Sequence, residues 1–176
     1  MTRIFIDADA CPVRDETYRV ALRYGLHTYV VSNRMIAVPD TPLIERVVVT
    51  QGMDVADDWI AEHATTHDIV ISADIPLAAR CVANGACVLE PRGRILDQDA
   101  IGMALAMRNL MTDLRDTGAI TQGSRGFTRA DRSTFLSALD TAVVRARRQA
   151  AGHNRRPPVI PPSASGNVPD QPSDKK

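Results

Sequence analysis

Lysine is nearly absent from this chain, which carries it only at Lys175 and Lys176, the last two of 176 residues. All other basic side chains except four histidines are arginines, so a site that depends on a lysine is excluded from the folded part. The formal net charge is zero. No overall field therefore favours nucleic acid or a membrane surface, and any basic patch must be local.

Cysteines are few, and long apolar runs are missing. The odd set of Cys11, Cys81 and Cys87 shows no metal-ligand spacing, which favours reduced thiols over a disulfide framework. No apolar run approaches the roughly 20 residues that a membrane helix needs, and no charged-then-apolar leader opens the chain. We therefore expect a cytoplasmic protein, with enough residues for one well-buried core but not two.

Short apolar runs followed by aspartate are the most informative feature that is present. Residues 4–6 run into Asp7 and Asp9, residues 47–49 precede Asp54 and Asp57, and residues 69–71 precede Asp74. Apolar β-branched runs of this kind are typical of strands in a parallel sheet that is covered on both faces. Ligands bind such sheets outside the carboxyl ends of the strands. The pattern therefore predicts an acidic site at that edge.

Strands and helices are expected to alternate along the chain. Pro12 is placed at the start of the first helix and Gly25 at its end. The predicted fold is α/β, with a mostly parallel five-stranded sheet and helices on both faces. One domain is expected over residues 1–150, followed by a disordered, proline-rich tail over 151–176. Strands are predicted at 3–9, 27–32, 46–50, 68–73 and 86–89, and helices at 13–24, 54–64, 75–84, 97–115 and 129–148.

Each aspartate has a structural alternative to metal binding. Asp54 is placed to cap the helix that follows it, and Asp74 to cap the next one, although a cap can also be a ligand. Asp57 lies one turn after Asp54, so both carboxylates can point to one place. Asp7 has no helix to cap, and Asp9 lies on the same side of the strand. Carboxylates brought together repel one another unless protons or cations intervene, and oxygen-rich clusters suit Mg²⁺ or Mn²⁺.

Several sequence blocks resemble a known family. They are Asp7-Ala8-Asp9-Ala10-Cys11-Pro12-Val13, Asp54-Val55-Ala56-Asp57, residues 68–78, Pro91-Arg92-Gly93, and Asp131-Arg132 before Phe135. In this order they are similar to the signature blocks of the YaiI/YqxD family of small bacterial proteins. The resemblance covers roughly residues 2–145. It implies a PIN-like three-layer fold and, by remoter analogy, the metal-dependent nuclease chemistry of PIN domains.

The expected function is divalent-metal-dependent phosphodiester hydrolysis, with RNA as the expected substrate and partner. Asp7, Asp9, Asp57 and Asp74 are the predicted catalytic residues, and Mg²⁺ or Mn²⁺ would be held by Asp7, Asp54, Asp57 and Asp74. Predicted substrate contacts are Asn33, Arg34, Arg92 and Arg132.

Two alternatives to the nuclease remain open. The first is a PIN-like protein that binds metal or RNA without cleaving. The second is a phosphatase in which the first aspartate of an Asp-x-Asp motif is the nucleophile, but such enzymes also need a lysine near the phosphoryl group. Nothing in the sequence indicates a homo-oligomer.

Overall fold

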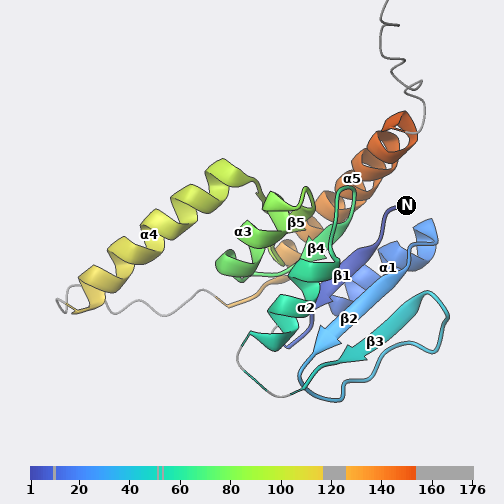
Figure 1. Cartoon of the computed structure of the whole chain (residues 1–176), viewed down its shortest axis with the longest axis horizontal. Helices are drawn as coiled ribbons and strands as arrows, with labels where there is room; N and C mark the ends of the chain where they lie inside the picture. The colour runs from blue at the N-terminus through green and yellow to red at the C-terminus, as the bar shows by residue number, and fades with distance from the viewer. Residues whose placement is uncertain (10, 51, 53, 117–125, 154–176) are drawn as a thin grey trace, which may run out of the picture.

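A computed structural model describes residues 1–9, 11–50, 52, 54–116 and 126–153. Its centre is a six-stranded sheet in the order β3-β2-β1-β4-β5-β6, shown in Figure 1. The first five strands are parallel, and only β6 runs antiparallel, beside β5. The strands are β1 (Ile4–Asp7), β2 (Thr28–Ser32), β3 (Ile44–Val48), β4 (Ile69–Ile71), β5 (Cys87–Leu89) and β6 (Ile95–Leu96).

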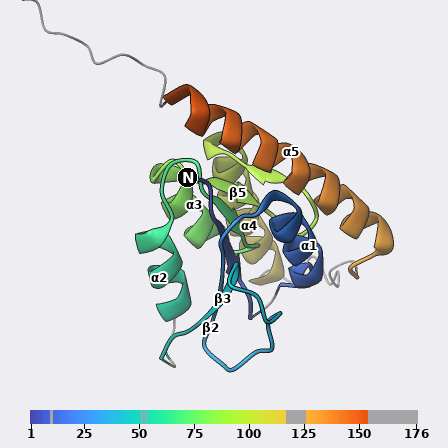
Figure 2. The ribbon, with the colours of Figure 1, turned by 90° about the vertical axis from the view of Figure 1, so that its right-hand side faces the viewer.

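Helices cover both faces of this sheet. On one face, α1 and α5 pack over a core that includes Ile4, Ile6 and Phe135. On the other, α2, α3 and the first turn of α4 pack over Phe5, Val70 and Leu77. Figure 2 shows α1 and α5 on one side of the sheet, with α2 on the other. The helices are α1 (Arg14–Tyr24), α2 (Val55–His63), α3 (Ile75–Ala83), α4 (Gln98–Asp116) and α5 (Arg129–His153).

The central strand explains why acids gather at one edge. Ile4, Phe5 and Ile6 of β1 are fully buried, because strands on both sides and helices on both faces surround them. Parallel neighbours end at the same level, so Asp7 emerges where β2 and β4 also stop. This edge is the crevice in which ligands of open parallel sheets bind.

The structure confirms the mostly parallel α/β architecture and corrects three details. β6 was not predicted, because a pair of residues is too short for a strand pattern to show. β3 starts two residues earlier than expected, because its pairing with β2 begins at Thr28 and Ile44. α1 starts at Arg14, so Pro12 precedes the helix, which does end at the left-handed Gly25 (φ 63°).

The C-terminal boundary also differs from the expectation. α5 continues to His153, so residues 151–153 extend the helix past the predicted start of the tail. The remainder of the predicted tail, residues 154–176, lies outside the described residues. Within the described residues, no helix is both long and apolar enough to cross a membrane.

Candidate metal and phosphate site

Two acidic pockets share Asp74 at the carboxyl edge of the sheet. The first, about 290 Å³, is lined by Asp7, Cys11, Ser72, Ala73, Asp74 and Pro91. The second, about 440 Å³, is lined by Asp54, Asp57, Asp58, Asp74, Pro76, Leu77, Arg80 and Arg108. The predicted residues Asp7, Asp54, Asp57 and Asp74 therefore form one acidic site with two adjoining hollows. They come from the end of β1, the start of α2 and the start of α3.

A buried serine joins two of these acids. The Ser72 side chain, only 2% exposed, donates a hydrogen bond to Oδ2 of Asp7 at 2.9 Å. The same hydroxyl accepts one from the backbone N–H of Asp74 at 3.0 Å. Sequence reasoning missed this role, although a signal existed: Ile6 pairs with Ile71, which places Asp7 next to Ser72.

The electrostatics show that the carboxylates act on one another. The pKa of Asp57 is raised to about 6, first by burial and then by the charges of Asp7, Asp74 and Asp54. Burial also raises the pKa of Asp7, with Asp9 and Asp74 adding to the rise and the Ser72 hydrogen bond opposing it. A site that raises carboxylate pKa values in this way favours a bound proton or cation.

Asp74 has the capping role that the sequence left open for it, and it also acts on the neighbouring acids. Its Oδ1 accepts the backbone N–H of Leu77 at 2.8 Å, which is the N-cap bond of α3. Its charge also raises the pKa of Asp7 and Asp57. The cap holds one carboxylate oxygen, and the same side chain lines both pockets.

Asp54 is not a side-chain cap, contrary to the structural alternative considered for it. It precedes α2 in the left-handed region, with φ 64°, and its side chain makes no cap hydrogen bond. Aspartate tolerates this conformation better than most residues, yet it is uncommon outside glycine. Its carboxylate instead lines the second pocket and raises the pKa of Asp57.

Asp9 turns toward the loop after β2. Its Oδ2 accepts the backbone N–H of Asn33 at 3.0 Å, and its Oδ1 lies 3.5 Å from Nε of Arg34. Arg34 also donates to the Asp9 carbonyl at 3.2 Å. Asn33 and Arg34, predicted to contact substrate, therefore hold Asp9 in place, while the Asp9 charge still raises the pKa of Asp7.

The two other predicted substrate contacts lie near the start of α5. Arg132 donates to the Pro12 carbonyl at 2.8 Å and to Oε1 of Glu16 at 2.9 Å, so it ties α5 to the start of α1. Arg92 lies 3.4 Å from Oδ2 of Asp131 and directly follows Pro91 of the first pocket. Arg92 therefore lies in sequence beside a residue of the first pocket, and Arg132 has a structural role.

A glycine fixes the approach of this loop to α5. Gly93 has φ 89°, and a Cβ there would meet the backbone of Thr134 at 2.9 Å. Only glycine permits both the conformation and the contact. The loop that carries Arg92 is therefore held closely against the helix.

Neither the thiol nor the hydroxyl of the first pocket is an activated nucleophile. Burial raises the pKa of Cys11 to about 11, so the thiol stays protonated near neutral pH. Ser72 is hydrogen-bonded to Asp7 and is almost fully buried.

The donor set fits a hydrated divalent ion better than a closed metal shell. Among the described residues, no three histidine, cysteine, aspartate or glutamate side chains converge closely enough to hold an ion together. Mg²⁺ commonly keeps several waters and binds through only one or two carboxylates. The oxygen-only acids around Asp7, Asp57 and Asp74 fit that mode of binding, and Mn²⁺ is the other ion that such ligands suit.

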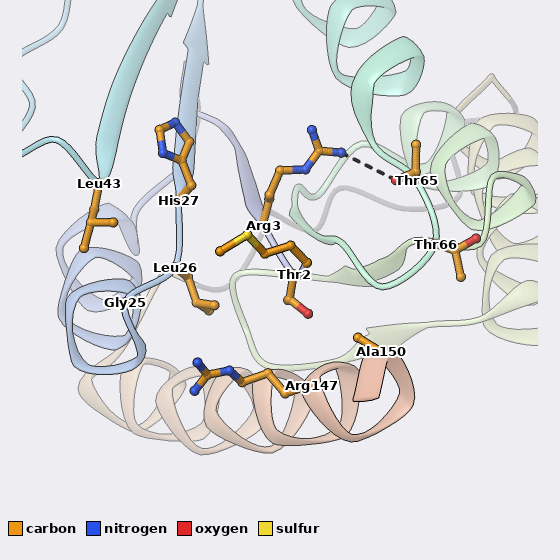
Figure 3. Close-up of a pocket in the computed structure, with 11 residues that line it drawn as sticks. Thr2, Arg3, Gly25, Leu26, His27, Leu43, Thr65, Thr66, Arg147 and Ala150 are labelled. Atoms are coloured by element: carbon orange, nitrogen blue, oxygen red, sulfur yellow. Dashed lines mark hydrogen bonds between the residues drawn. The ribbon is translucent and has the colours of Figure 1, made fainter. Parts of the chain in front are cut away.

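A larger cavity lies elsewhere, at the amino ends of the strands. It measures about 790 Å³, and Figure 3 shows Arg3, His27 and Arg147 among its lining residues. Its lining contains no carboxylate and none of the predicted site residues. Arg3, one of the basic residues that line this cavity, forms an ion pair with Asp68 at 2.6 Å. The acidic edge of the sheet therefore has smaller cavities than the amino edge.

Comparison with known proteins identifies the relatives of the chain. A UPF0178 protein of Gluconacetobacter diazotrophicus is 85% identical over 151 residues, covering 86% of this chain and 98% of that protein. A UPF0178 protein of Gluconobacter oxydans is 59% identical over 150 residues, covering 85% and 86%. One from Bradyrhizobium sp. (strain ORS 278) is 59% identical over 148 residues, covering 84% and 90%. No solved structure matches the chain.

The family assignment rests on a match that spans the domain. The sequence profile described as "Uncharacterized BCR, YaiI/YqxD family" matches residues 5–145, which include every aspartate of the two acidic pockets. The chain belongs to the YaiI/YqxD family.

Proposed function

We propose that this protein is a divalent-metal-dependent nuclease that hydrolyses phosphodiester bonds in RNA. The observation that carries the proposal is the rise in the pKa of Asp57 to about 6, caused by burial and by Asp7, Asp74 and Asp54. Carboxylates whose pKa values are raised by burial and by neighbouring charges are typical of functional sites. The PIN-type chemistry that the family resemblance implies is consistent with acids at this edge.

A bound Mg²⁺ or Mn²⁺ would supply positive charge to the phosphate oxygens of the scissile bond. Asp74, which borders both pockets, would hold it together with Asp7 in the first pocket or Asp57 in the second. The charges of Asp7 and Asp74 also raise the pKa of Asp57. Asp54 adds negative charge beside Asp57, and Asp9 adds it beside Asp7.

The remaining residues of the site orient these acids and the substrate. Ser72 fixes one oxygen of Asp7, leaving the other for a ligand. The N-cap bond similarly fixes one oxygen of Asp74. Arg92, beside the first pocket, would contact a substrate phosphate. Such preorganisation lowers the cost of bringing charge together during the reaction.

Cleavage of labelled single-stranded RNA in Mn²⁺ tests the proposal. Wild-type protein and Asp40→Asn, a change at an exposed loop acid, should both cleave. Asp7→Asn should lose activity, because it removes a negative oxygen from the ion's surroundings, and chelator should abolish cleavage by wild type. Equal cleavage by Asp7→Asn and wild type would sink the nuclease proposal and point to a contaminant.

A non-catalytic binding protein is the second candidate, favoured by one observation. Arg34 and Arg132, two of the predicted substrate contacts, are engaged by Asp9 and Glu16. In that case Mn²⁺ would still stabilise the fold while RNA stayed intact. A phosphate monoester control covers the phosphatase alternative, for which residues 1–174 supply no lysine.

A further inference from the structure

The cavity at the amino ends of the strands has the size of a small-molecule site. It measures about 790 Å³, and sites for small ligands and cofactors usually measure about 300–1,000 Å³. Residues that precede β1, β2, β3 and β4 form one side of it, and Arg147 and Ala150 of α5 form the other (Figure 3). The acidic site lies at the opposite ends of these strands. We call this space the amino-end cavity.

Arg147 supplies positive charge to this cavity that no carboxylate offsets. Among the described residues that line the cavity, three are basic and none is acidic. Arg3 is paired with Asp68 at 2.6 Å, and His27 lies 3.2 Å from Glu45. Arg147 contacts a tyrosine ring at 5.7 Å, but within the described residues it forms no ion pair and donates no hydrogen bond. Its N–H donors are therefore without a protein acceptor there.

The Thr2 hydroxyl is a second group of this cavity that lacks a partner. Thr2 is only 5% exposed, and its Oγ1 is buried without a hydrogen-bond partner among the described residues. The other buried threonines, Thr17 and Thr28, each donate to a backbone carbonyl, at 2.9 and 3.4 Å. A buried hydroxyl that makes no hydrogen bond is destabilising. Figure 3 shows this hydroxyl turned toward α5, the helix that carries Arg147, so a ligand between them would supply a partner to both.

The groups around the cavity select an organic phosphate. The guanidinium of Arg147 presents paired N–H donors that match two oxygens of a carboxylate or a phosphate. A phosphate monoester has a third oxygen for the Thr2 hydroxyl, whereas a carboxylate has only the two. The cavity is also far larger than a bare phosphate ion, and Leu26, Leu43 and Ala150 add apolar wall to it. An organic group beside the phosphate would cover that wall.

We propose that the amino-end cavity binds a small organic phosphate monoester, with Arg147 and Thr2 holding its phosphate. This site is independent of the proposed nuclease activity, because the acids lie at the other edge of the sheet. Without a bound cation those carboxylates repel a phosphate. Phosphate binding by the metal-free protein therefore reports on the amino-end cavity.

Isothermal titration of the full chain with adenosine 5′-monophosphate in chelator tests the site. Wild type should bind one molecule per chain. Arg147→Ala should weaken binding about 10- to 100-fold, because charge-assisted hydrogen bonds to the phosphate are lost. Arg148→Ala is the matched control: it removes the next exposed arginine of α5, which lies outside the cavity, and should bind like wild type. No binding by wild type, or equal binding by Arg147→Ala, overturns the proposal.

Thr2→Val separates a ligand contact from a structural role. Valine has a similar shape, and loss of an unpartnered hydroxyl should leave the melting temperature unchanged or raise it. Affinity for adenosine 5′-monophosphate should nevertheless fall about tenfold, because one hydrogen bond to a charged oxygen is lost. Unchanged affinity would contradict the contact with Thr2.

Two fragments of the probe test recognition of the phosphate itself. Inorganic phosphate should compete with adenosine 5′-monophosphate for wild type, and adenosine, which lacks the phosphate, should bind far more weakly. Adenosine that binds as tightly as the monophosphate would show that the phosphate is not recognised, and would overturn the proposal.

Discussion

At the scale of single residues, the acidic site depends on carboxylates that destabilise one another. Asp57 has its pKa raised to about 6, and Asp7 is raised by burial and by Asp9 and Asp74. An unfolded aspartate has a pKa of about 3.9. Between these values the folded protein binds more protons than the unfolded chain. The Asp57 contribution to stability therefore falls as pH rises from about 4 to about 6.

Asp57→Asn should stabilise the metal-free protein at pH 7 by removing this repulsion. Solvent screening of the part-exposed side chain limits the gain to about 1 kcal/mol or less. The gain should shrink toward pH 4, where wild-type Asp57 is protonated. Urea unfolding in chelator at both pH values measures it. Asp58→Asn is the matched control: it shares the first turn of α2, pairs with Arg80 at 2.7 Å, and should lower stability.

Ser72→Ala should destabilise the protein by about 1–3 kcal/mol at pH 7, because the Asp7 carboxylate loses its buried hydrogen bond from the Ser72 hydroxyl. The loss should be smaller at low pH, where Asp7 is neutral and its bond to Ser72 weaker. Thermal unfolding across pH provides the measurement. A penalty that does not change with pH would show that the Ser72 bond does not act through the Asp7 charge.

At the scale of elements, helix starts place the acids. Asp74 caps α3, and Thr128 and Asp131 cap α5 reciprocally, with the Thr128 N–H donating to Asp131 and the Asp131 N–H donating to Thr128. These caps hold the polar residues of the carboxyl edge at fixed positions. Local sequence signals predicted the α3 cap but could not decide the geometry of Asp54, which adopts a left-handed conformation without capping.

Two substitutions separate the contribution of the Asp74 cap to stability from the contribution of its negative charge. Asp74→Asn keeps a capping oxygen and removes the negative charge, so it should be at least as stable as wild type in chelator. Asp74→Ala loses the cap as well and should fall about 0.5–2 kcal/mol below the asparagine variant. Chemical denaturation of the three proteins measures the order. Equal stability of the two variants would mean that the cap contributes nothing.

At the scale of the whole molecule, a sequence of this kind predicts strands and helices well and side-chain partners poorly. The apolar runs at 4–6 and 69–71 indicated strands of a parallel sheet covered on both faces, but only the structure shows that these two strands are neighbours. The Arg34 contact with Asp9 and the Arg132 contact with Glu16 were unforeseen, because each joins residues far apart in sequence.

For the site, too, the position of the acids was easier to predict from the sequence than their individual contacts. The structure places Asp7, Asp57 and Asp74 around two adjoining pockets at the edge where parallel strands end, which is where the sequence pattern put acids. Binding of Mg²⁺ or Mn²⁺ remains a prediction that rests on the chemistry of those carboxylates. A ligand at about 100 times its dissociation constant should raise the free energy of unfolding by roughly 2.7 kcal/mol.

The most direct test of the cation site is the melting temperature of the full chain in millimolar Mn²⁺, in Mg²⁺ and in chelator. Wild type and Asp40→Asn should melt higher with either ion and return to the starting value when chelator is added. Asp7→Asn should melt higher than wild type without metal and gain little from the ions. A wild-type melt that neither ion changes, or an equal gain in Asp7→Asn, would contradict a cation site built on these acids.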